Sequence, residues 1–235
     1  MFITVKIRSL AKPAIAVFAA VLFVAAVFLA FPGKSAGVLA PYNCRTLLID
    51  AGHGGVDGGA VSAEGVKESD VNLAIALRMS GLCDLVGIGH HLTRESDVGC
   101  LESESYSEHD DLVARAQMAN SIPECVLISV HQNKYPSDIV RGAEIMYAQT
   151  PESKELGVIT QSNMVSALDP ENRRVAHSAP SQLLLTSSVN CPAILAECGF
   201  MSNPQEAGLL ADGNYQTKIA MTLIASYIQF SCRQL

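Results

Sequence analysis

A short apolar run that ends at a histidine among glycines constrains this chain more than any other feature. Residues 47–55 have the sequence LLIDAGHGG, which predicts a buried strand that ends just before His53. Open α/β sheets bind ligands at the carboxyl ends of their strands, and the flanking glycines leave the approach to the imidazole clear. The pattern therefore places His53 where such folds carry out chemistry.

The first forty of the 235 residues differ in composition from the rest. Three basic residues precede an uncharged apolar run over residues 14–31, which is long enough to cross a bilayer as a helix. A cleaved signal peptide is the alternative, although its apolar core is usually shorter and residues 32–41 contain no clean small-x-small cleavage site. We expect residues 1–32 to be a signal-anchor or signal peptide, 33–42 a linker, and 43–235 one exported domain.

The charge of the chain is distributed unevenly. Four of the 16 basic residues and none of the acidic ones lie before residue 41, which leaves 12 basic against 23 acidic side chains, a formal charge of −11. Because phosphate binding needs a basic surface, this balance argues against nucleic acid as a partner. It also disfavours electrostatic adsorption of the domain to anionic lipid.

The seven cysteines are scattered along the chain and odd in number. They do not form the pattern of a disulfide framework, and no C-x-x-C pair suggests an all-cysteine zinc site. We expect them to be small, buried, apolar residues.

Strand-like and helix-like segments alternate along the exported part. Strands are predicted near residues 45–51, 90–93, 126–131, 142–148 and 192–197, and helices near 68–84, 110–120, 152–168, 204–211 and 214–230. This alternation predicts an α/β fold with three layers, α/β/α, and a mostly parallel central sheet.

Two histidines and two glutamates fall at predicted strand ends or helix starts. His53 and His131 each follow a buried strand, Glu68 begins a helix, and Glu197 ends a further strand. Zinc in hydrolytic sites takes imidazole and carboxylate ligands, with three protein ligands and one position open to water. Each residue alone has a structural explanation, such as a turn or a helix-dipole partner. Together they predict a zinc hydrolase, with Glu197 able to move protons.

Other catalytic motifs are missing from the sequence. The loop over residues 52–59 has neither the Gly-Lys-Ser/Thr ending of a phosphate-binding loop nor Gly-x-Gly-x-x-Gly spacing. His-Glu-x-x-His is also absent, which excludes a thermolysin-like helix site. A cysteine hydrolase using Cys198 or Cys125 with a histidine stays as a distant alternative.

Over about residues 45–230 the chain resembles the zinc-dependent N-acetylmuramoyl-L-alanine amidases, which are cell-wall hydrolases. The order, spacing and residue types of several motifs agree with that family. These motifs are IDAGHGG at 49–55, DGGA at 57–60, Glu68 with NL at 72–73, LTR at 92–94, Arg115 with AN at 119–120, SVHQN at 129–133, GAE at 142–144 and ECGFMSN at 197–203.

The resemblance implies a phosphorylase/hydrolase-like fold, a catalytic domain over residues 43–235 and peptidoglycan as substrate. It implies one Zn²⁺ per chain held by His53, Glu68 and His131, with Glu197 as the catalytic carboxylate. The bond cleaved would be the amide between N-acetylmuramic acid and L-alanine of the stem peptide. The compact spacing is similar to single-domain enzymes of spore-cortex or general wall turnover. A zinc peptidase acting elsewhere on the stem peptide, or a non-catalytic wall-binding homologue, remains an alternative.

Three further residues are candidates for supporting roles. Asp50 can hold the tautomer of a ligand histidine, and Asn133 can orient the zinc ligands or the substrate, or else cap the turn after its strand. Arg94 can bind a substrate carboxylate, although an ion pair with Asp97 is the favoured interpretation. Arg115, Asn120 and Glu144 are expected to serve the fold, and alternation along the strand should point Cys198 away from the site.

Overall fold

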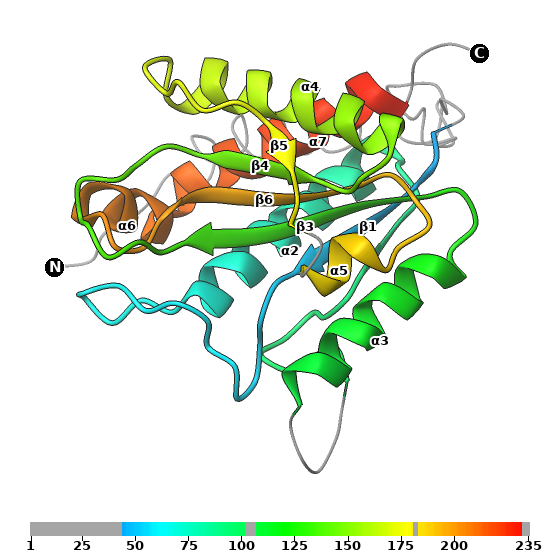
Figure 1. The fold of residues 1–235 in the computed structure, drawn as a ribbon, viewed down its shortest axis with the longest axis horizontal. Helices are drawn as coiled ribbons and strands as arrows, with labels where there is room; N and C mark the ends of the chain where they lie inside the picture. The colour runs from blue at the N-terminus through cyan, green and yellow to red at the C-terminus, as the bar shows by residue number, and fades with distance from the viewer. Residues whose placement is uncertain (1–43, 102–106, 181–182, 232–235) are drawn as a thin grey trace, which may run out of the picture. The chain divides into compact units, whose positions relative to one another are not determined.

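The computed structural model describes residues 44–101, 107–180 and 183–231, and six strands in these ranges form one sheet (Figure 1). The order across the sheet is β2-β1-β3-β6-β4-β5. The strands are β1 (Thr46–Ala51), β2 (His90–Leu92), β3 (Cys125–Asn133), β4 (Glu144–Tyr147), β5 (His177–Ser178) and β6 (Ala193–Phe200).

The sheet is mostly parallel, as the sequence predicted. β2, β1, β3 and β6 run parallel to one another, whereas β4 pairs antiparallel with β6 and β5 runs parallel to β4. Residues 134–143, between β3 and β4, contain no helix. A parallel partner needs a crossover of a dozen or more residues, so this short connection returns the chain in the opposite direction.

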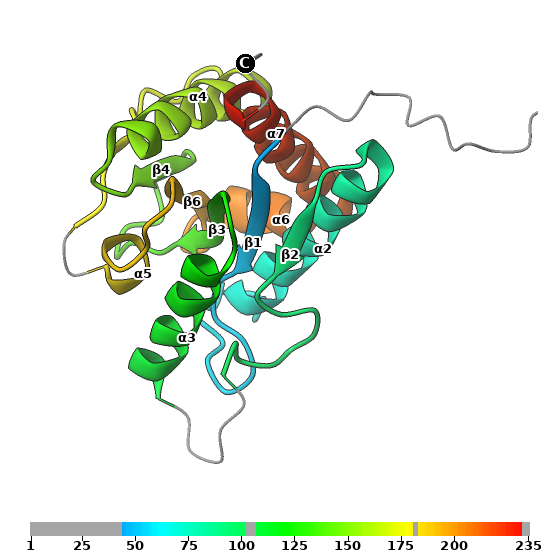
Figure 2. The same cartoon turned by 90° about the vertical axis from the view of Figure 1, so that its right-hand side faces the viewer.

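Helices cover both faces of the sheet, which confirms the three-layer prediction (Figure 2). On one face lie α2 (Glu68–Val86), α4 (Pro151–Leu168) and α7 (Gly213–Ser231), and on the other α3 (Glu108–Ser121) and α5 (Leu184–Ser187). The helix α6 (Pro204–Ala211) contacts α7 and β6.

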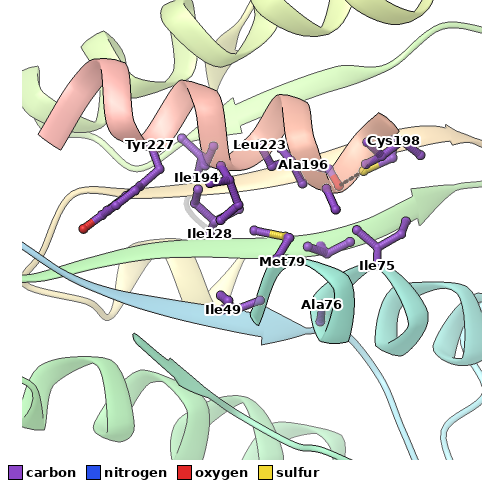
Figure 3. Packing of buried hydrophobic residues seen from close by; sticks show 14 of the residues in the cluster. Ile49, Ile75, Ala76, Met79, Ile128, Ile194, Ala196, Cys198, Leu223 and Tyr227 are labelled. Carbon is purple, nitrogen blue, oxygen red and sulfur yellow. Dashed lines mark hydrogen bonds between the residues drawn. The ribbon is translucent and has the colours of Figure 1, made fainter. Parts of the chain in front are cut away.

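Apolar side chains alternate between the two faces of the central strands. Ile49 and Ile128 pack under α2 and α7 in the larger cluster, together with Leu223 of α7 (Figure 3). Leu48 and Leu127 point to the smaller cluster beneath α3. Because helices cover both faces, β1 and β3 are buried on both sides, which explains their nearly continuous apolar sequences.

The ends of two strands differ from the prediction. β3 continues through His131 to Asn133, and β6 continues through Glu197 to Phe200. The ladder between them shifts register between His131 and Asn133, which is the mark of a β-bulge. The predicted strands ended at His131 and Glu197 because the apolar runs end at these polar residues. The strands continue further because main-chain hydrogen bonds do not depend on side-chain polarity. The two-residue β5 and four-residue α5 were not predicted, because segments so short show no periodicity.

The expectation for the cysteines is confirmed in part. Cys83, Cys125, Cys191 and Cys198 are free and buried, and Cys100 is free and partly exposed. Cys44, in contrast, is disulfide-bonded, so the expectation was wrong for this residue.

The predicted signal-anchor and linker, residues 1–42, lie outside the described residues. Within the part of the chain that the structure describes, no helix is both long enough and apolar enough to cross a bilayer.

A buried charge network lies under the carboxyl end of β1. Arg115 of α3 donates to the carboxylates of Asp50 and Asp111 at 2.5 and 2.7 Å. Asp50 also accepts from the hydroxyls of Thr93 and Ser129, so it joins β1 to β3 and to the end of β2. Burial alone would raise the pKa of Asp50, but Arg115 and the hydroxyl donors outweigh it and lower that pKa.

We predict that Asp50→Asn lowers the free energy of unfolding by about 3 to 5 kcal/mol at pH 7, because it breaks a buried ion pair. A lowered folded-state pKa gives stability that is present above the unfolded pKa and lost as pH falls below it. The difference between wild type and variant should therefore narrow below about pH 4. Urea denaturation at pH 7 and pH 3 measures both effects.

The matched control is Asp84→Asn, at an exposed position on α2. It should change the free energy of unfolding by less than about 0.5 kcal/mol. A loss in Asp50→Asn that stays constant between pH 7 and pH 3 would contradict the electrostatic explanation and assign the effect to packing.

Candidate metal centre

His53 lies in a left-handed turn directly after β1, with φ of 60°. Arg115 donates a 2.9 Å hydrogen bond to the His53 carbonyl, which fixes the main chain of this strained turn to the buried network. The loop then folds back, and Gly54 and Asp57 exchange main-chain hydrogen bonds. This turn aims the His53 imidazole across the end of the sheet.

Asp57 holds the orientation of that imidazole. Its Oδ2 atom lies 2.7 Å from His53 Nδ1. The other ring nitrogen, Nε2, is therefore directed at Glu68, whose Oε1 atom is 3.2 Å away. A carboxylate that accepts from one nitrogen of a histidine leaves the other nitrogen free to bind a metal.

Glu68 begins α2 and is nearly fully buried. Its Oε1 atom lies 3.1 Å from His131 Nδ1 and accepts from the main-chain N–H of Gln132. Its second oxygen accepts from the main-chain N–H of Ala60 at 2.8 Å. The carboxylate therefore lies between the two histidines, in a fixed orientation.

His131 completes the cluster from β3. Its ring meets the His53 ring edge to face, with centroids 4.9 Å apart. One ligand atom from each of His53, Glu68 and His131 lies within 4.8 Å of the others, and these three residues can hold a metal ion. Two imidazole nitrogens and a carboxylate oxygen are a donor set typical of catalytic zinc.

Two glycines allow the cluster to close. A Cβ atom on Gly52 would lie 2.3 Å from the His131 ring, and one on Gly59 would lie 2.6 Å from Glu68 Oε2. Gly59 also has a φ of 63°, which favours glycine. The backbone at Gly52 and Gly59 lies so close to the cluster that a side chain at either position would displace His131, Glu68 or His53.

Glu197 lies next to the cluster, opposite His131 in the β3–β6 ladder. Its Oε2 atom is buried and has no hydrogen-bond partner among the described residues. Burial raises the pKa of Glu197 to about 7, and the negative charges of Glu68 and Glu144 act in the same direction, against His131 and His53. A buried carboxylate oxygen without a hydrogen-bond partner among the described residues, beside three potential metal ligands, is a feature typical of a functional site.

The charges within the cluster respond to one another. Burial alone would lower the pKa of His53, but hydrogen bonds and attraction from Glu68 and Asp57 raise it to about 9. Burial would raise the pKa of Glu68, but the two histidines outweigh it and lower that pKa strongly. The cluster therefore gathers negative charge from Glu68 and Asp57 around two imidazoles, a field that favours a cation.

A cavity of about 320 Å³ opens beside the cluster. Its polar lining includes the two histidines, Glu197 and Asp57, and its apolar lining includes Leu183, Leu185 and Leu195. A site with a few convergent polar groups and an apolar wall is the usual form of a small-molecule or peptide site.

Asp50 is not the residue that holds a ligand histidine, so that hypothesis was wrong. Asp50 is engaged by Arg115 beneath the sheet edge, and Asp57 contacts His53 instead. No role for Asp57 was predicted from the sequence. Its position four residues after His53 in a glycine-rich loop could have indicated the contact, because a loop that turns back on itself brings such residues together.

Arg94 and Asp97 attract each other electrostatically, but the expected direct ion pair between them is not among the contacts of the described residues. Asp97 instead accepts from the main-chain N–H of Gly55. Arg94 is buried and donates to four main-chain carbonyls, those of Ala51, Gly52, Ser69 and Ser96. It therefore fixes the β1 end and the α2 start to each other.

The remaining candidates lie near Glu197. The side chain of Asn133 accepts a hydrogen bond from the main-chain N–H of Lys134, as expected if Asn133 caps the turn after β3. Its amide nitrogen lies 3.5 Å from a carboxylate oxygen of Glu144. Glu144 was expected to have no line to the metal site, but it pairs directly with Glu197 across β4 and β6. Arg174 and His177 hold its carboxylate at 3.1 and 3.2 Å.

Cys198 points away from the site, as predicted. Its thiol lies in the apolar layer between the sheet and α7 and donates to the carbonyl of Ala196 (Figure 3). Burial raises the pKa of this thiol, which makes it a poor nucleophile. A cysteine hydrolase built on Cys198 is therefore excluded.

The sequence over residues 47–229 matches the family of N-acetylmuramoyl-L-alanine amidases. The chain belongs to this family. Its members are peptidoglycan hydrolases, and the family and enzyme class predicted from the sequence motifs are confirmed. The matched range contains all four central residues of the site.

Individual amidases resemble the chain over most of its length. The germination-specific N-acetylmuramoyl-L-alanine amidase of Bacillus subtilis (strain 168) is 31% identical over 195 residues, which cover 81% of each protein. The CwlD amidase from Clostridioides difficile, solved in complex with the GerS lipoprotein, is 32% identical with a TM-score of 0.73 and covers 79% of this chain and 98% of that one.

A second solved structure, an N-acetylmuramoyl-L-alanine amidase from Clostridium difficile 630, is 30% identical with a TM-score of 0.70. It covers 80% of this chain and 97% of that one. The similarity therefore extends over nearly the whole amidase structure.

We predict that Gly59→Ala weakens zinc binding at least 10-fold, because the new methyl group would displace Glu68 or His53. Competition with a chromophoric chelator measures the affinity. Gly65→Ala is the matched control, since Gly65 lies in the same loop at a φ of 86° but has open space around its Cβ position.

Gly65→Ala should lower stability through backbone strain and leave zinc affinity unchanged. Equal losses of affinity in both variants would show that strain in the loop, rather than close approach to the ligands, controls binding.

Proposed function

We propose that the chain cleaves the amide bond between N-acetylmuramic acid and L-alanine of the stem peptide. In this proposal His53 Nε2, Glu68 and His131 Nδ1 hold one Zn²⁺, and Glu197 is the catalytic carboxylate. The observation that supports it most strongly is the convergence of three ligand atoms within 4.8 Å beside a buried carboxylate oxygen that has no partner among the described residues.

The residues present fit a zinc ion. The donor set has two imidazoles and one carboxylate, and Asp57 supplies the second interaction that usually orients a zinc-bound histidine. A zinc ion in this position supplies Lewis acidity to a scissile carbonyl and lowers the pKa of water toward neutrality.

Glu197 handles the proton in this proposal. Glu197 lines the cavity, so its carboxylate can accept a proton from the attacking water and deliver it to the amide nitrogen that leaves. No hydrogen bond from a described residue to Glu197 Oε2 has to break before this oxygen takes the proton. Attachment to the middle of a paired strand keeps its position fixed between β3 and β4.

The cavity wall matches a lactyl-peptide junction. Leu183, Leu185 and Leu195 contribute apolar surface to the cavity that His53, His131 and Glu197 also line. The methyl groups of the lactyl unit and of L-alanine can lie against that surface, while the scissile carbonyl points at the histidines.

We further propose that the enzyme acts outside the cytoplasm and is anchored or exported by residues 14–31. The support is the basic flank before this apolar run, the acidic balance of the remainder, and the cell-wall role of related amidases. The substrate would then be peptidoglycan close to the membrane surface, and nucleic acid would be no partner.

We predict that Glu197→Gln lowers the rate of hydrolysis by roughly 10²- to 10⁴-fold, because the amide cannot accept the proton. Zinc content should stay near one per chain. Digestion of purified peptidoglycan followed by mass spectrometry measures the free stem peptide, and metal analysis of the same sample measures zinc.

Glu95→Gln, at an exposed position after β2, is the matched control and should keep full activity. Wild-type activity in Glu197→Gln would refute the role of Glu197. Products in which the peptide is cut but stays joined to muramic acid would identify a peptidase instead.

A further inference from the structure

Two cysteines lie at the start of neighbouring strands, one within β3 and one just before β6, at the end of the sheet opposite the metal centre. Cys125 is the first residue of β3, and Cys191 lies two residues before the start of β6. Leu127 pairs with Ala193, so counting back two residues on each strand places Cys125 opposite Cys191. Neighbouring strands lie about 4.7–4.9 Å apart, within the Cα separations of about 4.4–6.8 Å that disulfides span.

The two side chains also meet. Both belong to the apolar cluster beneath α3, and the two side chains interact with each other. Both are free cysteines in this structure.

A cavity lies next to the buried pair. Both cysteines line a cavity of about 260 Å³, together with Arg45 and Glu152. Arg45 is held by Glu152 at 2.7 Å. The interaction with Cys125 lowers the pKa of the Cys191 thiol against the opposing effect of burial, and the positive charge of Arg45 also lowers it. Cys191 is therefore the better nucleophile of the two.

The same end of the sheet already carries an oxidised cysteine. Cys44, which immediately precedes Arg45, is disulfide-bonded. A chain that keeps one disulfide works in surroundings that allow a second to form.

We propose that Cys125 and Cys191 are a redox site at which a small-molecule disulfide oxidises the two thiols to an intramolecular disulfide. The Cys191 thiolate attacks one sulfur of the oxidant and releases the first thiol. The Cys125 thiol then loses its proton as its sulfur attacks the Cys191 sulfur of the mixed disulfide, which releases the second thiol. The two protein thiols lose two electrons and two protons, and the oxidant is reduced to two thiols.

The new bond would join the start of the strand that carries His131 to the start of the strand that carries Glu197. It would close a loop over residues 125–191, which restricts the unfolded chain and raises the melting temperature. The metal centre lies at the other ends of these strands, so hydrolysis should not change.

The test is to incubate the full-length chain with oxidised glutathione, block the remaining thiols by alkylation, and map the peptides without reduction. We expect a peptide that links Cys125 to Cys191, and a rise in melting temperature of about 5 to 10 °C. Cys125→Ser and Cys191→Ser should each abolish the linked peptide and the rise. Cys100→Ser, which removes a free thiol outside the pair, should keep both.

Three results would overturn the proposal. They are stable glutathione adducts on both residues without a link, thiols at 125 and 191 that stay fully reduced after long incubation, and a link from either residue to Cys44. Peptidoglycan hydrolysis is not used in this test, so its outcome does not depend on the proposed function.

Discussion

The metal centre depends on the buried ion pair between Arg115 and Asp50. Arg115 neutralises a carboxylate that has no exposure to water and at the same time binds the carbonyl of His53, the residue in the left-handed turn. Burying a charge is costly unless it is paired and hydrogen-bonded, and this pair meets both conditions. The network therefore links β1, β3 and α3 to the main chain of His53 and fixes the position of this proposed metal ligand.

The chemistry of the site follows from a second constraint, which is unequal hydrogen bonding of carboxylates. Glu68 and Asp57 are each satisfied by neighbours and stay fixed, whereas Glu197 Oε2 is buried without a partner among the described residues. Carboxylates in different surroundings can serve different roles, one as ligand and one as proton carrier. Burying Glu197 Oε2 without a hydrogen-bond partner lowers the free energy of unfolding. Such an unfavourable local arrangement is often found at functional sites.

Long, periodic segments and the four central residues were predictable from the sequence. His53, Glu68, His131 and Glu197 stood at changes of pattern, and the parallel topology brought those changes to one sheet edge. Asp57 and Glu144 were missed as neighbours of the site because a folded-back loop and an antiparallel strand set their positions. The partners of Arg94 were not predicted because they are main-chain carbonyls, which every residue carries and which the sequence therefore does not mark. The disulfide at Cys44 was missed because its pairing depends on tertiary structure.

The proposed metal centre is tested most directly by X-ray absorption at the zinc edge on the purified, zinc-loaded chain. We predict one zinc per chain, with two imidazole nitrogens at about 2.0–2.1 Å and a carboxylate oxygen as protein ligands. His131→Ala should remove one imidazole from the spectrum. A zinc ion bound through sulfur, or a wild-type spectrum that His131→Ala does not change, would contradict the assignment of this centre.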